Sequence, residues 1–222
     1  MRLAALAVVL VAAANAWCFR LEAAGTWSFW LGLTLPYLAL ASLALYRMWD
    51  DGTLLDKLKP RWGDLSIGAV TAAVLLMASW AARAALAPVG TPRFLWLLRV
   101  YAQVGNPETI QRSALYSSLV LLIPVLEELT WRGMVQDALE ERFGPRRGWP
   151  FAALAYALAH TPTLIVLTAP GAGPNPLLVT AALGTGLVWG FTARLSGRLP
   201  PVIFSHVAFT YFTAVQFRLP GM

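Results

Sequence analysis

Residues 113–135 read SALYSSLVLLIPVLEELTWRGMV, and this stretch decides the class of the fold. Its centre, residues 119–126, is wholly apolar, and a helix of about 20 apolar residues crosses the roughly 30 Å hydrocarbon layer of a bilayer. Glu127 and Glu128 follow before such a helix has left the membrane. Ionisable groups inside a membrane are costly and usually mark functional sites. The stretch therefore predicts a membrane-spanning helix that carries two functional carboxylates.

The rest of the chain is equally apolar. Of its 222 residues, 58% are hydrophobic and 13% are charged, whereas soluble domains are about half apolar and a quarter charged. This composition excludes a soluble monomer. It predicts an all-α, polytopic transmembrane helical bundle of about seven spans, with residues 1–222 forming a single integral membrane domain. The predicted spans are residues 3–19, 27–48, 65–89, 113–135, 150–167, 177–195 and 199–217.

The first apolar run has two interpretations. It ends in Ala14-Asn15-Ala16, which is typical of the cleavage site of a secretory signal peptide. However, a second apolar span begins at Trp27, so no soluble ectodomain follows the run. We therefore expect an uncleaved first helix.

The segments between the spans are short and contain breakers. Residues 49–64 are rich in charge and predict a solvated connection, while residues 91–103 predict a short interfacial helix. Within the sixth span, Gly186 and Gly190 lie on one helix face, where a neighbouring backbone can approach closely.

The net charge of +6 does not indicate nucleic-acid binding, because the basic residues are scattered between apolar segments. They instead indicate orientation, since short cytoplasmic loops carry most Lys and Arg. With seven spans, the side opposite the amino terminus collects only Arg20, Arg93, Arg99, Arg112 and Arg218. We therefore expect a cytoplasmic amino terminus. Cys18 is the only cysteine, so the chain has no intramolecular disulfide and no cysteine-based metal site.

The polar side chains inside the spans are few and chemically consistent. Besides the two glutamates they include His160 and His206, which are the only histidines in the chain. Counted inward from the expected cytoplasmic ends, Glu127 and both histidines lie roughly 10 to 15 Å deep at 1.5 Å per residue. The three side chains can therefore share one plane of the membrane and one site.

The helical period separates the two glutamates. Arg132 lies four residues after Glu128, in the favourable order for an ion pair, and can keep Glu128 ionised. Glu127 has no such partner on its own helix and is free to face the histidines as a general base. The alternative is that Glu127, Glu128 and Arg132 form only a structural ion cluster.

Each histidine has a neighbour that bears on its role. Tyr156 lies one turn before His160 and Pro162 lies shortly after it, so the helix should be kinked or end near this imidazole. Thr210 lies one turn after His206, where its hydroxyl either donates to a developing oxyanion or, as we expect, bonds back to its own helix.

Two chemistries fit one carboxylate and two imidazoles. Glu127, His160 and His206 could bind zinc as a two-histidine, one-glutamate site with an open water position, or they could activate water directly. The pattern does not choose between them, and we commit to no cofactor. The chain has no His-Glu-x-x-His zinc helix, no Gly-x-Ser-x-Gly elbow and no paired intramembrane aspartates.

These motifs resemble those of the CPBP family of intramembrane proteases, the Abi-type family of CAAX proteases and bacteriocin-processing enzymes. The resemblance rests on Glu127-Glu128-x-x-x-Arg132, Tyr156-x-x-x-His160 and His206, together with the segments 186–190 and 197–201. It covers residues 113–217, the expected catalytic core. The first hundred residues match only as spans.

The resemblance implies a bundle that encloses an intramembrane catalytic cavity. In it Glu127 and His160 would activate water, His206 would help to stabilise the oxyanion, and Glu128 and Arg132 would support them. Two positions depart from the family pattern, which usually has Phe at Tyr156 and Asn or Asp at Thr210. The second departure puts the oxyanion partner in doubt and suggests a divergent branch. The family is often labelled metalloprotease, although its better-understood members resemble metal-independent glutamate proteases.

Family members cleave prenylated tails, process bacteriocin leaders, confer immunity, or trim carboxy-terminal sorting anchors, as in the myxosortase branch. Richness in Ala, Arg, Gly and Leu suggests a GC-rich bacterial genome, where prenylated tails are not expected. We therefore expect an enzyme of the bacterial inner membrane that cleaves membrane-embedded or membrane-anchored peptides or proteins. A non-catalytic scaffold or bacteriocin-immunity protein is the alternative. A proton-coupled transporter would typically show repeated halves, and no such repeat is present.

Overall fold

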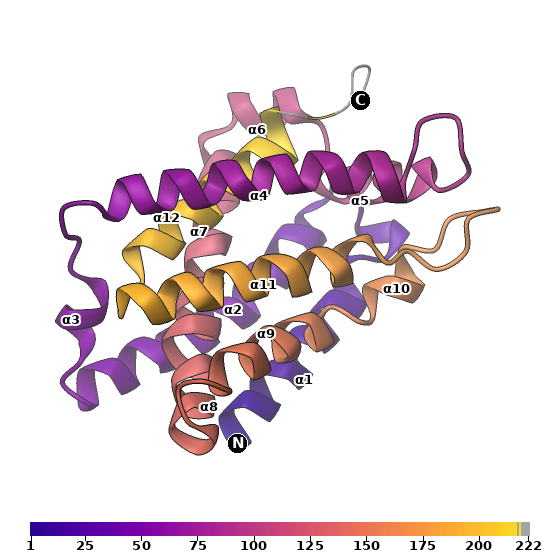
Figure 1. Ribbon diagram of the computed structural model, residues 1–222. Coiled ribbons are helices and arrows are strands. Elements are labelled where there is room, and N and C mark those ends of the chain that lie inside the picture. Colours follow the sequence, from indigo (N-terminus) through magenta and orange to yellow (C-terminus); the bar gives the residue numbers. More distant parts are fainter. Residues whose placement is uncertain (217, 219–222) are drawn as a thin grey trace.

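Five helical segments in the described part of the chain are long and apolar enough to cross a membrane. The computed structural model describes residues 1–216 and 218, and this part is helical apart from its turns and one isolated bridge between Ala169 and Gly173 (Figure 1). The five segments are α2 (Trp27–Asp50), α4 (Asp64–Leu86), the continuous run Ala114–Phe143, the run Gly148–Val166 and α11 (Leu177–Ser196). The prediction of an all-helical membrane bundle is confirmed.

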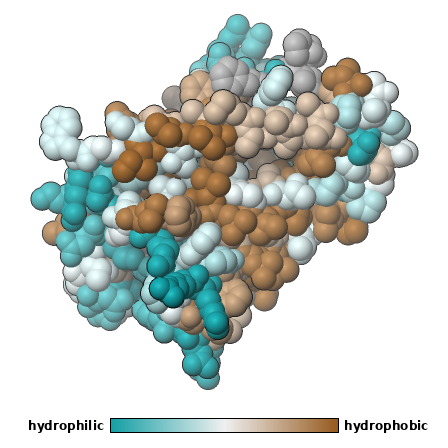
Figure 2. All heavy atoms as spheres, viewed as in Figure 1, coloured by the Kyte–Doolittle hydropathy of each residue, from teal (hydrophilic) through white to brown (hydrophobic). Residues whose placement is uncertain are grey.

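Two shorter helices occupy the first and last predicted spans. Helix α1 (Arg2–Cys18) has 17 residues, and α12 (Pro200–Tyr211) has 12 before a π-helical turn, η3 (Phe212–Gln216). The predicted end of the last span, Phe217, lies outside the described residues. Figure 2 shows a broad apolar band across the middle of the molecule, with hydrophilic side chains gathered at the end near α3 (Leu54–Leu58) and α8 (Gln136–Phe143).

The helix with the two glutamates is longer than predicted and is not uniform. Helix α7 (Ala114–Thr130) begins at Ser113, whose side chain accepts a hydrogen bond from the Tyr116 amide. A π-helical turn, η2 (Trp131–Val135), then joins α7 to α8 without a break. Turns of this kind are rare and occur frequently at functional sites.

The helix of His160 ends where the sequence predicts. Helix α9 (Gly148–Ala159) stops at Ala159, and His160 is its C-cap residue. Three residues later the short helix α10 (Thr163–Val166) continues the span. His160 therefore lies in a turn inside the membrane-spanning run, as the nearby Pro162 led us to expect.

Helices α9 and α11 approach closely at glycines, as predicted. A Cβ atom at Gly186 would lie 3.3 Å from atoms of both Ala153 and Tyr156, and one at Gly190 would lie 3.3 Å from Gln136 Oε1. Because these contacts are tighter than ordinary packing, glycine at both positions lets α11 lie this near to α9 and α8 without displacing the neighbouring atoms.

The remaining segments connect and brace the bundle. They are η1 (Leu21–Ala23), α5 (Phe94–Val104), which confirms the expected helix at 91–103, and α6 (Pro107–Arg112). The connection at 49–64 contains α3, which the pattern did not indicate. Lys57 forms an ion pair of 2.6 Å with Asp137 of α8, and Arg198 pairs with Asp64 at the start of α4. The hydrogen bond to Asp64 raises the pKa of Arg198 above its usual value. This connection is therefore docked on the bundle, not simply solvated.

Candidate active site

The ion pair within α7 and its π turn forms as predicted. Glu128 is fully buried, and Arg132 Nη1 donates to Glu128 Oε1 at 2.9 Å. The guanidinium lies between two aromatic rings, 5.0 Å from the Tyr156 centroid and 5.5 Å from the Trp189 centroid. Its second nitrogen reaches the Gly186 carbonyl of α11 at 3.4 Å. Arg132 thereby ties α7 to α9 and α11.

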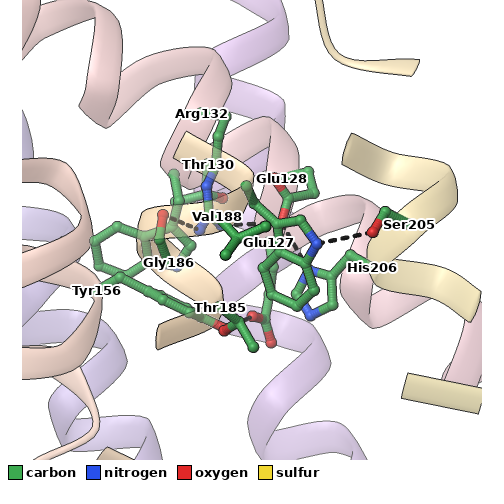
Figure 3. Close-up of polar contacts among 12 residues, drawn as sticks. Glu127, Glu128, Thr130, Arg132, Tyr156, Thr185, Gly186, Val188, Ser205 and His206 are labelled. Atoms are coloured by element: carbon green, nitrogen blue, oxygen red, sulfur yellow. Dashed lines mark hydrogen bonds and ion pairs between the residues drawn. The ribbon is translucent and has the colours of Figure 1, made fainter. Parts of the chain in front are cut away.

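His206 pairs with Glu128 and not with Glu127. Its Nδ1 lies 2.7 Å from Glu128 Oε1, the same oxygen that Arg132 contacts. The imidazole stacks on Trp189 with ring centroids 3.8 Å apart, and the Trp189 indole donates to Ser205 Oγ at 3.0 Å. Helices α7, α11 and α12 therefore meet at one buried carboxylate (Figure 3).

Glu127 has a different environment. Its Oε2 accepts a hydrogen bond of 2.6 Å from the Tyr156 hydroxyl of α9, and its side chain is only partly buried. The Tyr156 ring is held by Trp131, with centroids 5.2 Å apart. Figure 3 shows Glu127 and Tyr156 meeting on one side of the cluster, with Glu128 and His206 together on the other. The two glutamates therefore lie in different hydrogen-bond networks.

His160 sits in the turn after α9, close to Glu127. Its Nδ1 lies 2.8 Å from the Tyr156 carbonyl, and its ring packs edge-on against the Tyr156 ring, with centroids 4.7 Å apart. A carbonyl oxygen only accepts, so Nδ1 carries the proton and Nε2 keeps its lone pair in the neutral ring. Glu127 and His206 both lie near enough to interact with His160 electrostatically.

The structure thus brings six predicted residues together, Glu127, Glu128, Arg132, Tyr156, His160 and His206, but distributes their contacts differently from expectation. Glu127 contacts Tyr156, whereas His206 contacts Glu128. Within the described residues, no three His, Cys, Asp or Glu side chains form a group that could hold a metal ion. Thr210 is partly buried one turn after His206 in α12.

Sequence reasoning missed three aromatic residues around the site. Trp189 stacks on His206, and Trp131 donates through its indole nitrogen to the Tyr37 hydroxyl of α2 at 3.2 Å. All three are almost fully buried. Their positions in apolar runs indicate packing as readily as function, so the only signal was that Trp131 and Trp189 lie within a few residues of the motifs.

A small polar cavity of about 80 Å³ lies beside Arg132, between α8 and the segment that joins α11 to α12. Arg132 forms part of its wall, together with Lys57, Gln136, Asp137, Glu140, Ala193, Arg194, Gly197, Arg198 and Leu199. Glu128 Oε2, Gln136 Oε1 and Arg194 Nη1 are buried without a hydrogen-bond partner among the described residues. Buried polar atoms of this kind are normally satisfied by water.

The comparisons with known proteins bear on the same part of the chain. Residues 109–212 match the sequence model of the family described as type II CAAX prenyl endopeptidase Rce1-like. No curated protein and no solved structure matches the chain. The matched segment holds both glutamates, Arg132, Tyr156 and both histidines. The chain thus carries an Rce1-like endopeptidase domain, consistent with the CPBP family of intramembrane proteases that the sequence motifs predicted.

Proposed function

We propose that this protein is an intramembrane endopeptidase in which Glu127 activates water for attack on a peptide bond of a membrane-embedded or membrane-anchored substrate. One observation carries the assignment of the base. Glu128 is fully buried and shares one oxygen between Arg132 and His206, whereas Glu127 is partly exposed and accepts a hydrogen bond from Tyr156. A general base needs a free lone pair near water, and Glu127 meets this requirement.

The proposed reaction follows from these contacts. Glu127 takes a proton from water, and the resulting hydroxide adds to the carbonyl carbon of the peptide bond. When the tetrahedral intermediate collapses, the carbon–nitrogen bond breaks and Glu127 returns the proton to the amine. His160, whose neutral ring has its lone pair on Nε2, orients the water as a hydrogen-bond acceptor.

His206 is the proposed oxyanion donor. Its Nδ1 proton is already directed at Glu128, so donation from Nε2 requires an imidazolium with protons on both nitrogens. The Glu128 carboxylate at 2.7 Å and the stacked Trp189 ring hold the imidazole in this orientation. Arg132 and Tyr156 support the two glutamates, and Thr210 has only a secondary role on α12.

Among the described residues, no three potential ligands form a group that could hold a metal ion, and this supports direct water activation by Glu127 over the zinc alternative.

The proposed substrates are peptides or proteins cut near a carboxy-terminal or membrane-anchoring segment. The matched family is named for prenylated CAAX tails, but the Ala-, Arg-, Gly- and Leu-rich sequence suggests a bacterial host, where such tails are not expected. We propose the inner membrane of that host as the location, with the amino terminus in the cytoplasm.

The test compares membrane-protein termini by mass spectrometry in host cells that carry the wild type or Glu127→Gln at equal abundance. The amide has nearly the shape of the carboxylate but cannot take the proton, so the protein should insert normally and specific termini should disappear. Glu108→Gln, in an exposed ion pair with Arg112, is the matched control and should leave every terminus in place. Identical profiles for wild type and Glu127→Gln would favour the scaffold or immunity alternative.

A further inference from the structure

Helix α1 contributes a buried polar contact to the turn that carries His160. The Asn15 side chain is 2% exposed, and its Nδ2 donates to the Ala159 carbonyl at 2.9 Å. Ala159 is the last residue of α9 and is fully buried. The two residues are 144 positions apart in the sequence, and α1 packs along α9 (Figure 1).

The bonded carbonyl belongs to the peptide unit that joins Ala159 to His160. The last carbonyls of a helix have no partner inside the helix, so a side chain from elsewhere can satisfy and fix them. The His160 amide bonds to the Ala157 carbonyl, and the His160 carbonyl accepts from Thr163. Asn15 therefore fixes the peptide plane from which the imidazole projects.

We propose that Asn15 is a positioning residue for His160, and that α1 is consequently a permanent part of the enzyme and not a leader that is removed. The effect on catalysis rests on the proposed function, whereas the placement of the turn does not. The Asn15 side chain bonds to the Ala159 carbonyl, and so it acts through the Ala159–His160 peptide.

Packing of α1 supports its retention. Its buried residues Ala4, Ala7 and Val11 belong to the same hydrophobic cluster as Ala159 and Tyr156. Cleavage after Ala16, the site that the Ala14-Asn15-Ala16 pattern would give, would remove these residues and Asn15 together.

The matched control for Asn15 is a second buried asparagine. Asn175 is fully buried and donates through Nδ2 to the Trp96 carbonyl of α5 at 3.0 Å. Asn175 lies in the turn before α11, and its side chain bonds to the Trp96 carbonyl and the Leu177 amide, not to the His160 turn. Its backbone amide donates to the Leu164 carbonyl of α10, a bond that a side-chain replacement leaves in place. Asn15→Leu and Asn175→Leu each keep the branched shape and the number of heavy atoms and remove the donor, and Asn175→Leu also removes the acceptor of the Leu177 amide.

The experiment has a readout that does not depend on activity. With isotope-labelled histidine the purified full chain gives only two imidazole spectra by nuclear magnetic resonance, from His160 and His206. Asn15→Leu should move the His160 signals and leave those of His206 in place, while Asn175→Leu should move neither. Unmoved His160 signals in Asn15→Leu would overturn the proposal, as would an intact mass that begins after Ala16.

Kinetics then test the consequence for catalysis. Because Asn15 does not touch substrate, Asn15→Leu should lower kcat by about tenfold or more with KM within about twofold of wild type. Asn175→Leu should change kcat less than about twofold at a similar loss of thermal stability. Equal losses of kcat in the two variants would reduce Asn15 to a structural role. If the wild type shows no Glu127-dependent cleavage, the proposed function fails while the spectroscopic result still stands.

Discussion

Removal of the Arg132 side chain should destabilise this protein far more than removal of any exposed arginine. The variant Arg132→Ala leaves Glu128, which is fully buried, without the guanidinium at 2.9 Å. Breaking a buried pair in this way costs about 3–5 kcal/mol. His206 still contacts the same oxygen at 2.7 Å, so we expect about 3 kcal/mol, the lower end of that range. This value corresponds to a roughly 100-fold rise in the unfolded fraction.

The chain supplies a matched control for this variant. Arg112 and Glu108 form a second pair with the same four-residue spacing, but their nitrogen and oxygen are 3.8 Å apart and the two side chains are 83% and 73% exposed. Arg112→Ala should therefore have little or no measurable effect. Thermal unfolding of the purified full chain in one detergent measures both variants under the same conditions.

A double variant separates lost charge pairing from lost packing. Arg132→Met combined with Glu128→Gln removes both the buried guanidinium and the buried carboxylate, and replacing both members of a buried pair is often neutral. The double variant should therefore be more stable than Arg132→Met alone. Equal unfolding temperatures for Arg132→Ala and Arg112→Ala would refute the reasoning, as would a double variant no better than the single one.

Three further predictions concern the packing of α9 against α11, the Tyr156 hydroxyl and the zinc alternative. Gly186→Leu should destabilise the bundle by about 1–3 kcal/mol, because the new Cβ would lie 3.3 Å from Ala153 and Tyr156. Gly184→Leu is the control, since Gly184 has open space around it and its replacement should not destabilise the bundle. Equal unfolding temperatures for the two variants would contradict the close approach of α9 and α11. Tyr156→Phe removes the 2.6 Å hydrogen bond to Glu127 but keeps the ring, so kcat should fall by up to about tenfold with folding intact, and complete inactivity would assign the hydroxyl a direct part in the chemistry. A zinc chelator should leave the cleavage rate unchanged, since no three-residue ligand group is present among the described residues. A loss of activity that added zinc restores would instead favour the zinc mechanism.

The parts of the site that sequence alone predicts are those set by local geometry. Glu128 and Arg132 lie four residues apart on one helix, so their pairing follows from the helical period. The break beside His160 follows in the same way from the nearby Pro162. The composition likewise decides the membrane class, because burial in lipid requires apolar residues on nearly every helix face.

Contacts between helices could not be predicted in the same way. The sequence placed Glu127 and the histidines at one depth, but depth does not say which imidazole meets which carboxylate. The choice of Glu128 for His206 depends on the rotation of α12 against α7, and the bond from Tyr156 to Glu127 depends on how closely the glycines let α9 and α11 approach. Asn15 contributes through a contact across 144 positions that no local pattern indicates.

The π turn at Trp131–Val135 sets the angular register between the two halves of the long helix. Its hydrogen bonds span five residues instead of four, so it accommodates one more residue than an α-helical turn of the same rise. A chain shortened by one residue within this turn could form an uninterrupted α-helix whose two halves keep nearly the same relative orientation. Gln136, which donates to the Gly190 carbonyl at 3.1 Å, and Asp137, which pairs with Lys57, would then keep their partners. A deletion in the regular part of α7 would instead rotate everything after it by about 100° and break both contacts. The π turn is therefore the part of this helix where the loss of one residue changes the register of the following residues least.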